Sequence, residues 1–246
     1  MPILRFVLIA VAVLAAALPA RAQQTQTPPL TREQVEQIVR EYLIKNPEII
    51  VEAIEELEAR HKKSAQASQR DAVAARQEQL HRDPDAPVLG NPAGDVTVVE
   101  FFDYRCPYCK QVAPALSQLL KEDGNLRLVL KEFPILGPDS VVASRAALAA
   151  QAQGKYAPMH AALLRHRGAY DEAAIARLAT DAGLDAARLK SDMAKPEIAA
   201  MIDRNKALAR ELSLTGTPAF IIGDKVVPGA ADLDTLKTLV AAARKR

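Results

Sequence analysis

The spacing of apolar residues divides the chain into a helical first part and a mixed second part. Between residues 30 and 57, apolar side chains recur three and four positions apart, which is the pattern of an amphipathic helix with one apolar stripe. From Ser64 to Leu80 the pattern fades into Ala, Gln and Arg, so we expect that stretch to be helical but mostly solvated. The predicted stripe consists of Val35, Ile38, Val39, Tyr42, Leu43, Ile50, Ala53, Ile54 and Leu57.

Local signals mark the starts of two helices in this first part. Thr31 and Gln34 have the spacing of a capping box, and Asn46 followed by Pro47 predicts the start of a second helix. The region has too few large apolar side chains to form a core alone, so its stripe must pack on another surface. That surface is either the rest of the chain or a second copy. An isolated stripe favours self-association, although it lacks the regular heptads of a coiled coil.

Turn-forming residues separate this arm from a part in which strands and helices alternate. Clusters of Pro, Gly, Asn and Asp at residues 83–87 and 90–94 predict a boundary between an arm at 23–85 and a domain at 86–246. The order of strand, helix, strand, helical block, hairpin and helix predicts an α/β fold. The expected strands are Val96–Phe102, Leu126–Leu130, Ala219–Ile222 and Lys225–Val227, and the expected helices are Pro107–Lys121, Ser140–Gln153, Tyr156–His166, Asp171–Ala182, Asp185–Leu212 and Asp232–Ala243.

The first 22 residues have the features of an export signal. One basic residue, Arg5, precedes an apolar run from Phe6 to Leu18, and the segment ends in the small-x-small sequence Ala20-Arg21-Ala22. The run is shorter than the ~20 residues that span a bilayer, and Pro19 favours cleavage over retention as an uncleaved N-terminal anchor. We therefore expect a secreted mature protein in an oxidising compartment, where disulfides persist.

The charge balance argues against one class of function. The chain has 32 Lys and Arg against 30 Asp and Glu, and Arg5 and Arg21 fall in the predicted signal, which leaves the mature chain formally neutral. Nucleic-acid binding requires dense neutralisation of phosphates. We therefore expect no nucleic-acid partner.

A Cys-Pro-Tyr-Cys sequence carries the candidate chemistry. Cys106 follows a buried-type strand by four residues and opens the helix expected from Pro107. Free N–H groups and the positive dipole end at a helix start stabilise a thiolate, so we expect Cys106 to be the more exposed and more acidic thiol, and the nucleophile. Cys109, one turn further on, is expected to resolve the mixed disulfide. This redox-active pair would need no other cofactor.

Other interpretations of the two cysteines stay open. A purely structural disulfide would close so small a loop that it would stabilise the fold little. His160 and His166 follow the cysteines by about fifty residues, which is too far for a compact zinc module, so we expect no resident metal. Transient capture of Cu(I) by the two thiols is chemically reasonable.

Three sequence blocks resemble the DsbA-like thiol:disulfide interchange proteins of the thioredoxin superfamily. They are VEFFDYRCPYC at residues 99–109, KEFPILGP at 131–138 and GTPAF at 216–220. Blocks in this order, with Gly-Thr-Pro about 110 residues after the cysteines, are far more specific than Cys-x-x-Cys alone. The resemblance implies a thioredoxin fold with a helical insertion, here at about 139–212. The arm resembles that of the suppressor-of-copper-sensitivity C branch, which includes oligomeric isomerases.

The resemblance also implies roles for residues outside the cysteine pair. Glu100 stands where the family has a buried acid that relays the proton of Cys109; a surface carboxylate is the alternative. Lys131 stands where the family often has a basic partner for that acid; a solvated lysine is the alternative. Pro218 matches the cis-proline opposite the active site, where it and Thr217 would present backbone to an extended substrate segment.

Two departures from the family's strong oxidants bear on the predicted reaction. Tyr108 stands where those oxidants have His, and Thr217 stands where the monomeric oxidase has Val. Both favour an isomerase or a reductase, with Pro107 and Tyr108 completing the substrate site. We therefore expect a periplasmic, homo-oligomeric enzyme that acts on unfolded or misfolded secreted proteins and depends on a membrane thiol-redox partner. The alternative is a copper-binding or surface-binding protein that retains the fold.

Overall fold

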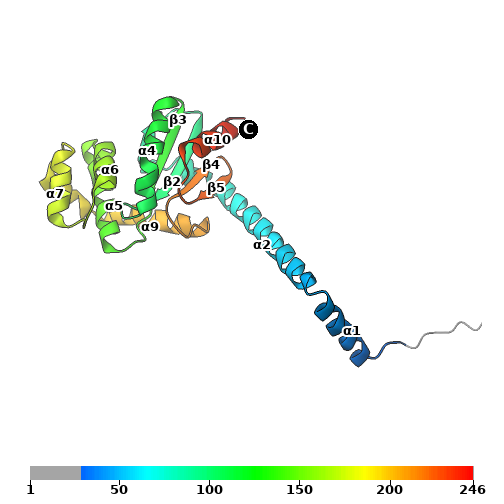
Figure 1. Cartoon of the computed structure of the whole chain (residues 1–246). Coiled ribbons are helices and arrows are strands. Elements are labelled where there is room, and N and C mark those ends of the chain that lie inside the picture. Colours follow the sequence, from blue (N-terminus) through cyan, green and yellow to red (C-terminus); the bar gives the residue numbers. More distant parts are fainter. Residues whose placement is uncertain (1–28, 246) are drawn as a thin grey trace, which may run out of the picture. The chain divides into compact units, whose positions relative to one another are not determined.

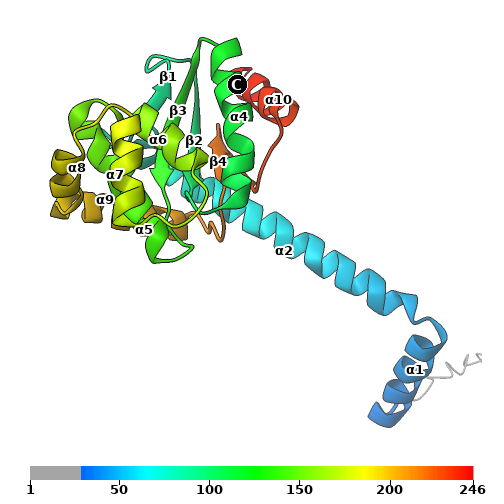
Figure 2. The same ribbon diagram turned by 60° about the vertical axis from the view of Figure 1, so that its left-hand side comes forward.

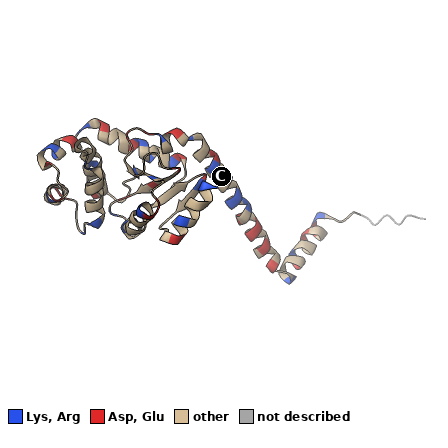
Figure 3. Cartoon of the chain, turned by 90° about the horizontal axis from the view of Figure 1, so that it is seen from above, with Lys and Arg blue, Asp and Glu red and all other residues tan. Residues whose placement is uncertain are grey.

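The computed structural model describes residues 29–245, which fall into two compact units, one ending at Glu58 and the other beginning at Ala59 (Figure 1). The predicted export signal at residues 1–22 lies outside the described residues. In the described part of the chain, no helix is long and apolar enough to cross a membrane. Charges of both signs are distributed over the helices (Figure 3).

The first unit contains helix α1 (Arg32–Lys45) and the first turns of α2 (Glu48–Ala75). The predicted capping box is present: the Gln34 N–H donates to Thr31 Oγ1 at 3.3 Å, and the Thr31 N–H donates to Gln34 Oε1 at 2.9 Å. Asn46 differs from its predicted role as the cap of the second helix. Its side chain and backbone N–H both donate to Tyr42 O, so it closes the end of α1. Along the predicted stripe, seven large side chains are exposed by 44–57%: Val35, Ile38, Val39, Tyr42, Ile50, Ile54 and Leu57.

The second unit is organised around a sheet of five strands in the order β1-β3-β2-β4-β5. Only β2 and β3 run parallel; the other neighbours are antiparallel. β2 and β3 are covered on both faces, which explains their nearly continuous apolar sequences. The short edge strand β1 lies within the turn-rich segment and was not expected. The strands are β1 (Val88–Gly90), β2 (Val96–Phe102), β3 (Leu126–Glu132), β4 (Ala219–Ile222) and β5 (Lys225–Pro228).

Helices cover the two faces of this sheet and form two separate apolar cores. Helices α4 and α10 lie side by side against one face (Figure 2), where Phe102 and Leu130 pack with the insertion helices. On the opposite face, Val99 and Phe101 pack with α9 and with the end of the long helix α2. The helices of this unit, besides the end of α2, are α3 (Gln77–His81), α4 (Pro107–Glu122), α5 (Pro138–Ala150), α6 (Tyr156–Arg165), α7 (Glu172–Asp181), α8 (Ala186–Met193), α9 (Pro196–Glu211) and α10 (Leu233–Arg244), with the 3-10 turn η1 (Gln151–Gln153) after α5. The thioredoxin fold with a helical insertion is confirmed.

One helix predicted in the insertion is two helices. The segment 185–212 was expected to be continuous, but α8 ends at Met193 and α9 begins at Pro196. Lys195 has extended dihedral angles there, because a residue that precedes proline is driven out of the helical region. Pro196 then takes the first position of α9, where its missing N–H costs nothing.

The segment that follows the apolar stripe is anchored in the second unit. Val73 of α2 and Leu80 of α3 are completely buried among the side chains of the second core. Gln69 donates a hydrogen bond to Leu212 O at 3.0 Å, and Arg76 pairs with Glu211 at 2.7 Å. The stretch that we expected to be mostly solvated is therefore held by two buried residues. The division between units lies at residue 58, well before the expected boundary at 85.

Lys131 does not partner Glu100, and that expectation is wrong. Glu100 pairs in register with Leu130, whereas Lys131 pairs with Phe101. Since neighbouring residues of a strand point to opposite faces, the acid and the lysine lie on opposite sides of the sheet. Lys131 is 1% exposed, and its Nζ contacts Asp83 Oδ2 at 2.6 Å. Burial lowers the pKa of Lys131, and the bond to Asp83 opposes that shift.

Replacement of Asp83 should destabilise the second unit. Asp83→Ala leaves the Lys131 ammonium buried without its carboxylate, so we expect the free energy of unfolding to fall by about 3 kcal/mol. Urea unfolding followed by circular dichroism measures this. The control is Glu78→Gln, which breaks the exposed pair with Arg82 and should cost less than ~1 kcal/mol. Equal losses in both variants would contradict a specific role for the buried pair.

Candidate active site

The two cysteines lie at the start of α4, directly after the central strand β2. Cys106 is the N-cap residue and Pro107 the first residue of the helix. Both thiols are reduced and buried, with Cys106 4% and Cys109 1% exposed. The helix start therefore directs its free N–H groups and positive dipole end toward Cys106, as the sequence predicted.

A buried carboxylate holds the turn before the cysteines. Asp103 accepts hydrogen bonds from the N–H groups of Arg105, Ile135 and Leu136, at 2.7, 2.8 and 3.0 Å. The Arg105 guanidinium also donates to Leu136 O at 2.8 Å. Asp103 thus ties the turn that leads into α4 to the loop that follows β3. This tie fixes the position of the cysteine pair relative to Ile135 and Leu136.

The loop that contains Pro218 lies against Cys106. The peptide bond between Thr217 and Pro218 is cis, and the Cys106 thiol donates to Thr217 O at 3.2 Å. The structure thus brings together Cys106, Thr217 and Pro218, which are separated by about 110 residues in sequence. Around them, the side chains of Tyr108, Ile135 and Leu136 are exposed, by 61%, 40% and 41% respectively.

Glu100 lies in the protein interior near Cys109. The carboxyl is 4% exposed, and its pKa is raised to about 8, first by burial and then by the neighbouring Glu132. Burial also raises the pKa of the Cys109 thiol, and the charge of Glu100 adds to that increase. Cys109 is therefore a poor nucleophile until a base takes its proton.

A second buried acid, Glu132 at the end of β3, was not expected to have a role. It is fully buried and accepts hydrogen bonds from the Tyr104, Tyr156 and Ser144 hydroxyls at 3.1, 2.8 and 2.7 Å. The signal was present in the sequence: once β2 and β3 are paired, strand alternation places Glu132 on the same face as Glu100. The hydroxyl partners, which come from distant elements, had no such signal.

The two histidines considered as metal ligands have other roles. His160 Nδ1 lies 2.9 Å from the Tyr104 hydroxyl, and its ring stacks on Tyr156. Burial lowers the pKa of His160 to about 3, which keeps it neutral. His166 Nε2 lies 2.9 Å from Ala169 O. Within residues 29–245, no three His, Cys, Asp or Glu side chains gather as a metal-binding group.

Cations from separate segments lie near the start of α4. Lys110 Nζ donates to His166 O at 2.5 Å and lies 5.5 Å from the centre of the Tyr170 ring. Burial lowers the pKa of Lys110, and the charges of Arg167 and Arg105 lower it further. The site thus contains positive charge although Tyr108 contributes none. Sequence reasoning missed Arg167 because only the folded insertion brings it close.

Comparison with known proteins identifies two regions. Residues 97–241 match the family described as DSBA-like thioredoxin domain, and residues 32–63 match the copper resistance protein ScsC N-terminal domain. A solved thioredoxin-like oxidoreductase from Silicibacter pomeroyi DSS-3 is 48% identical, with a TM-score of 0.67, covering 69% of this chain and 98% of that one. Proteus mirabilis ScsC in a transitional conformation is 28% identical, with a TM-score of 0.66, covering 87% of this chain and 96% of that one.

A curated relative contains a similar region within a much longer chain. The Na(+)/H(+) antiporter NhaA 1 of Salinispora arenicola (strain CNS-205) is 35% identical over 164 residues. That alignment covers 65% of this chain and 25% of the antiporter. The chain therefore spans about a quarter of the length of this relative.

The two thiols should differ sharply in reactivity. In the reduced protein at pH 7, we expect iodoacetamide to modify Cys106 first, because Cys106 is the N-cap residue of α4 while burial raises the pKa of Cys109. Peptide mass spectrometry after brief labelling measures the ratio. The control is the unfolded chain in urea, where both cysteines should react at similar rates. Preferential labelling of Cys109 in the folded protein would reverse the assignment.

Proposed function

The chain belongs to the DSBA-like thioredoxin domain family of thiol:disulfide oxidoreductases, and from this premise we propose that it rearranges incorrect disulfides in secreted proteins within the periplasm. The observation that carries the proposal is the Cys106 thiol at the start of α4, 3.2 Å from Thr217 O in the cis-proline loop. A thiol at this place can attack a disulfide presented along that loop.

The reaction exchanges one disulfide for another without net oxidation. The Cys106 thiolate attacks one sulfur of a substrate disulfide, which forms a mixed disulfide and releases the other substrate sulfur as a thiolate. A substrate thiolate then attacks the substrate sulfur of the mixed disulfide, forms the rearranged disulfide and releases Cys106. If the mixed disulfide persists, Cys109 attacks Cys106 Sγ. The substrate then leaves as a thiol and the Cys106–Cys109 disulfide forms.

The resolving step needs a base, and restoring the reduced cysteine pair afterwards needs a source of electrons. Glu100 takes the proton of Cys109 as the thiolate forms. In this step the substrate is reduced and the enzyme is oxidised to the Cys106–Cys109 disulfide. A membrane thiol-redox partner must therefore supply two electrons and two protons to restore the dithiol. Because isomerisation starts from the reduced pair, that partner keeps the enzyme active.

The surroundings of Cys106 suit unfolded protein substrates. The exposed side chains of Tyr108, Ile135 and Leu136 provide apolar contacts at the protein surface. Thr217 O is available to an extended peptide when that peptide displaces the Cys106 thiol. Backbone contacts do not depend on the substrate's side chains, and the apolar contacts are loose. Such a surface would therefore bind many peptide sequences rather than one.

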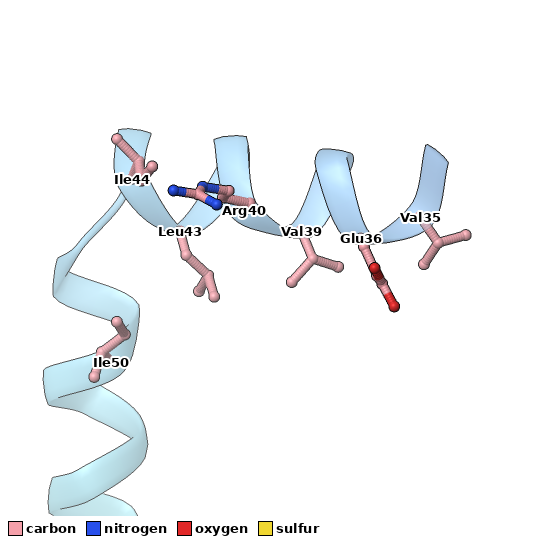
Figure 4. Close-up of a pocket in the computed structure, with 7 residues that line it drawn as sticks. All are labelled: Val35, Glu36, Val39, Arg40, Leu43, Ile44 and Ile50. Carbon is pink, nitrogen blue, oxygen red and sulfur yellow. The ribbon is translucent and has the colours of Figure 1, made fainter. Parts of the chain in front are cut away.

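The arm supports a homo-oligomer. Within the first unit, an open apolar groove of about 550 Å³ lies between α1 and α2. Figure 4 shows Val35, Val39 and Leu43 along α1, with Ile50 on the first turn of α2. We assign the same stripe of a second copy as the occupant, because Glu36 and Arg40 line the groove with opposite charges and Arg40 of one copy can pair with Glu36 of the other, in addition to the contact of Glu36 with Arg32 at 2.8 Å. Several catalytic domains on one assembly would hold a misfolded substrate by multivalent contact.

Disruption of the stripe should separate isomerisation from simple thiol exchange. In the chain from residue 23, Val39→Asp should convert the oligomer to a monomer by sedimentation and slow the rearrangement of a scrambled-disulfide protein at least ~10-fold. Reduction of a small disulfide such as oxidised glutathione should be unchanged. Point variants are preferable to deletion of residues 23–80, which would remove the buried Val73 and Leu80.

The matched control for this variant is Gln37→Asp. It places the same charge on an exposed position of α1, on the side away from the stripe. It should leave the assembly and both activities unchanged. A monomeric wild-type chain, or a Val39→Asp variant that rearranges the substrate at the wild-type rate, would refute the role of the arm.

Removal of the proton acceptor should slow the resolving step. Because an amide accepts no proton, Glu100→Gln should slow release of glutathione from a Cys106 mixed disulfide about 10–100-fold near pH 8, in a variant that remains folded. Stopped-flow mixing with detection of the released thiol measures the rate. Glu172→Gln, on an exposed side chain, is the control. Equal rates in the wild type and Glu100→Gln across pH 6–9 would rule out the relay.

A further inference from the structure

We propose that Glu132 is a positioning residue, whose buried carboxylate faces Glu100 and makes Glu100 the group that exchanges a proton with Cys109. The inference rests on the proposed relay through Glu100 and adds a second acid that the relay requires. It concerns a residue that touches neither the substrate nor the reacting sulfurs.

The register of the two central strands makes the acids neighbours. β2 and β3 run parallel, with Glu100 opposite Leu130 and Phe102 opposite Glu132. Glu132 therefore lies two residues beyond the partner of Glu100, on the same face of the sheet. Both side chains are buried, at 4% and 0% exposure. Two carboxyl groups so placed cannot both ionise easily, because repulsion is poorly screened in the interior.

The hydroxyl groups around Glu132 determine which acid carries the charge. Tyr104 and Tyr156 donate to one carboxylate oxygen and Ser144 donates to the other. Burial raises the pKa of Glu132 to about 8 as well, but hydrogen bonds to a carboxylate favour its charged form, and these three oppose the effect of burial. For Glu100, burial and the charge of Glu132 act in the same direction and raise its pKa to about 8. Of the two acids, Glu132 therefore ionises first, and the proton that remains is on Glu100.

The other titratable groups nearby do not cancel this charge. Tyr156 and Cys109 face Glu100, and Asp103 adds a further negative charge near Glu132. His160, which contacts Tyr104, stays neutral because burial lowers its pKa to about 3. Lys131 lies on the opposite face of the sheet. With its charge uncompensated, Glu132 makes Glu100 a stronger base than burial alone would.

The proton balance follows from this arrangement. Glu100 first releases its own proton to solvent; when Cys109 then attacks the mixed disulfide, the Cys109 proton passes to the ionised Glu100 and the sulfur–sulfur bond to the substrate breaks. When the Cys106–Cys109 disulfide is later reduced, Glu100 returns that proton to the Cys109 thiolate. A carrier whose pKa is close to the working pH can do both.

The first test titrates Glu100 directly, without reference to activity. In the reduced full-length mature chain with ¹³C-labelled glutamate, carboxyl NMR should show the Glu100 midpoint falling by about one pH unit or more in Glu132→Gln. Ser144→Ala, which removes one donor to Glu132, should shift the midpoint in the same direction by less. Glu172→Gln should leave it unchanged. An unchanged Glu100 midpoint in both Glu132→Gln and Ser144→Ala would overturn the inference.

The second test distinguishes failure of this inference from failure of the relay. The pH profile of glutathione release from the Cys106 mixed disulfide should have an inflection that Glu100→Gln abolishes and Glu132→Gln moves to lower pH. A profile that Glu100→Gln leaves unchanged would overturn the relay, whatever NMR shows. A profile that depends on Glu100 but not on Glu132 would overturn the role of Glu132. If Glu132→Gln does not fold, Ser144→Ala decides by both measurements.

Discussion

Strands β2 and β3 are covered on both faces, so each polar side chain on them has to find its partners inside the protein. On one face this produces the pair of Glu100 and Glu132, surrounded by hydroxyl groups. On the other face Lys131 reaches Asp83, which follows α3. The first arrangement places proton-binding groups behind the cysteines, and the second fixes the segment after α2 to the sheet. The buried acids behind the cysteines and the attachment of the segment after α2 thus both result from the burial of β2 and β3 on their two faces.

The helical insertion contributes to the site as well as covering it. Ser144 comes from α5, and Tyr156 and His160 come from α6. Each lies within the network that begins at Glu132. The same insertion brings Arg167 near Lys110 and Arg105, at the start of α4. A thioredoxin sheet with its cysteine pair would have none of these groups, so the insertion adds to the electrostatic surroundings that β2 and α4 provide.

The sequence predicted the features that depend on local pattern or on short motifs. The sheet strands β2 and β3, the cysteine pair at a helix start, and the loop containing Pro218 all carry such signals. The break before Pro196 could also be predicted, because proline disfavours the helical conformation of the residue before it. The expectation of one continuous helix arose because the flanking residues favour helices. The partner of Lys131 could not be read from a motif, since only the register of β2 and β3 shows which face the side chain occupies. The three-residue strand β1 forms because β3 offers it an edge, and no periodicity in so short a segment indicates this.

The buried acids also link proton binding to folding. In the native chain the pKa of Glu100 and the pKa of Glu132 are each raised to about 8, whereas the ordinary value for glutamate is 4.5. Between these two pH values the native state binds more protons than the unfolded chain, so unfolding releases protons and becomes more favourable as the pH rises. The contribution of the pair to stability is thus largest below the ordinary glutamate pKa and is lost through the neutral range. The stability cost of keeping these two acids buried therefore grows as the pH rises and decreases in mildly acidic surroundings.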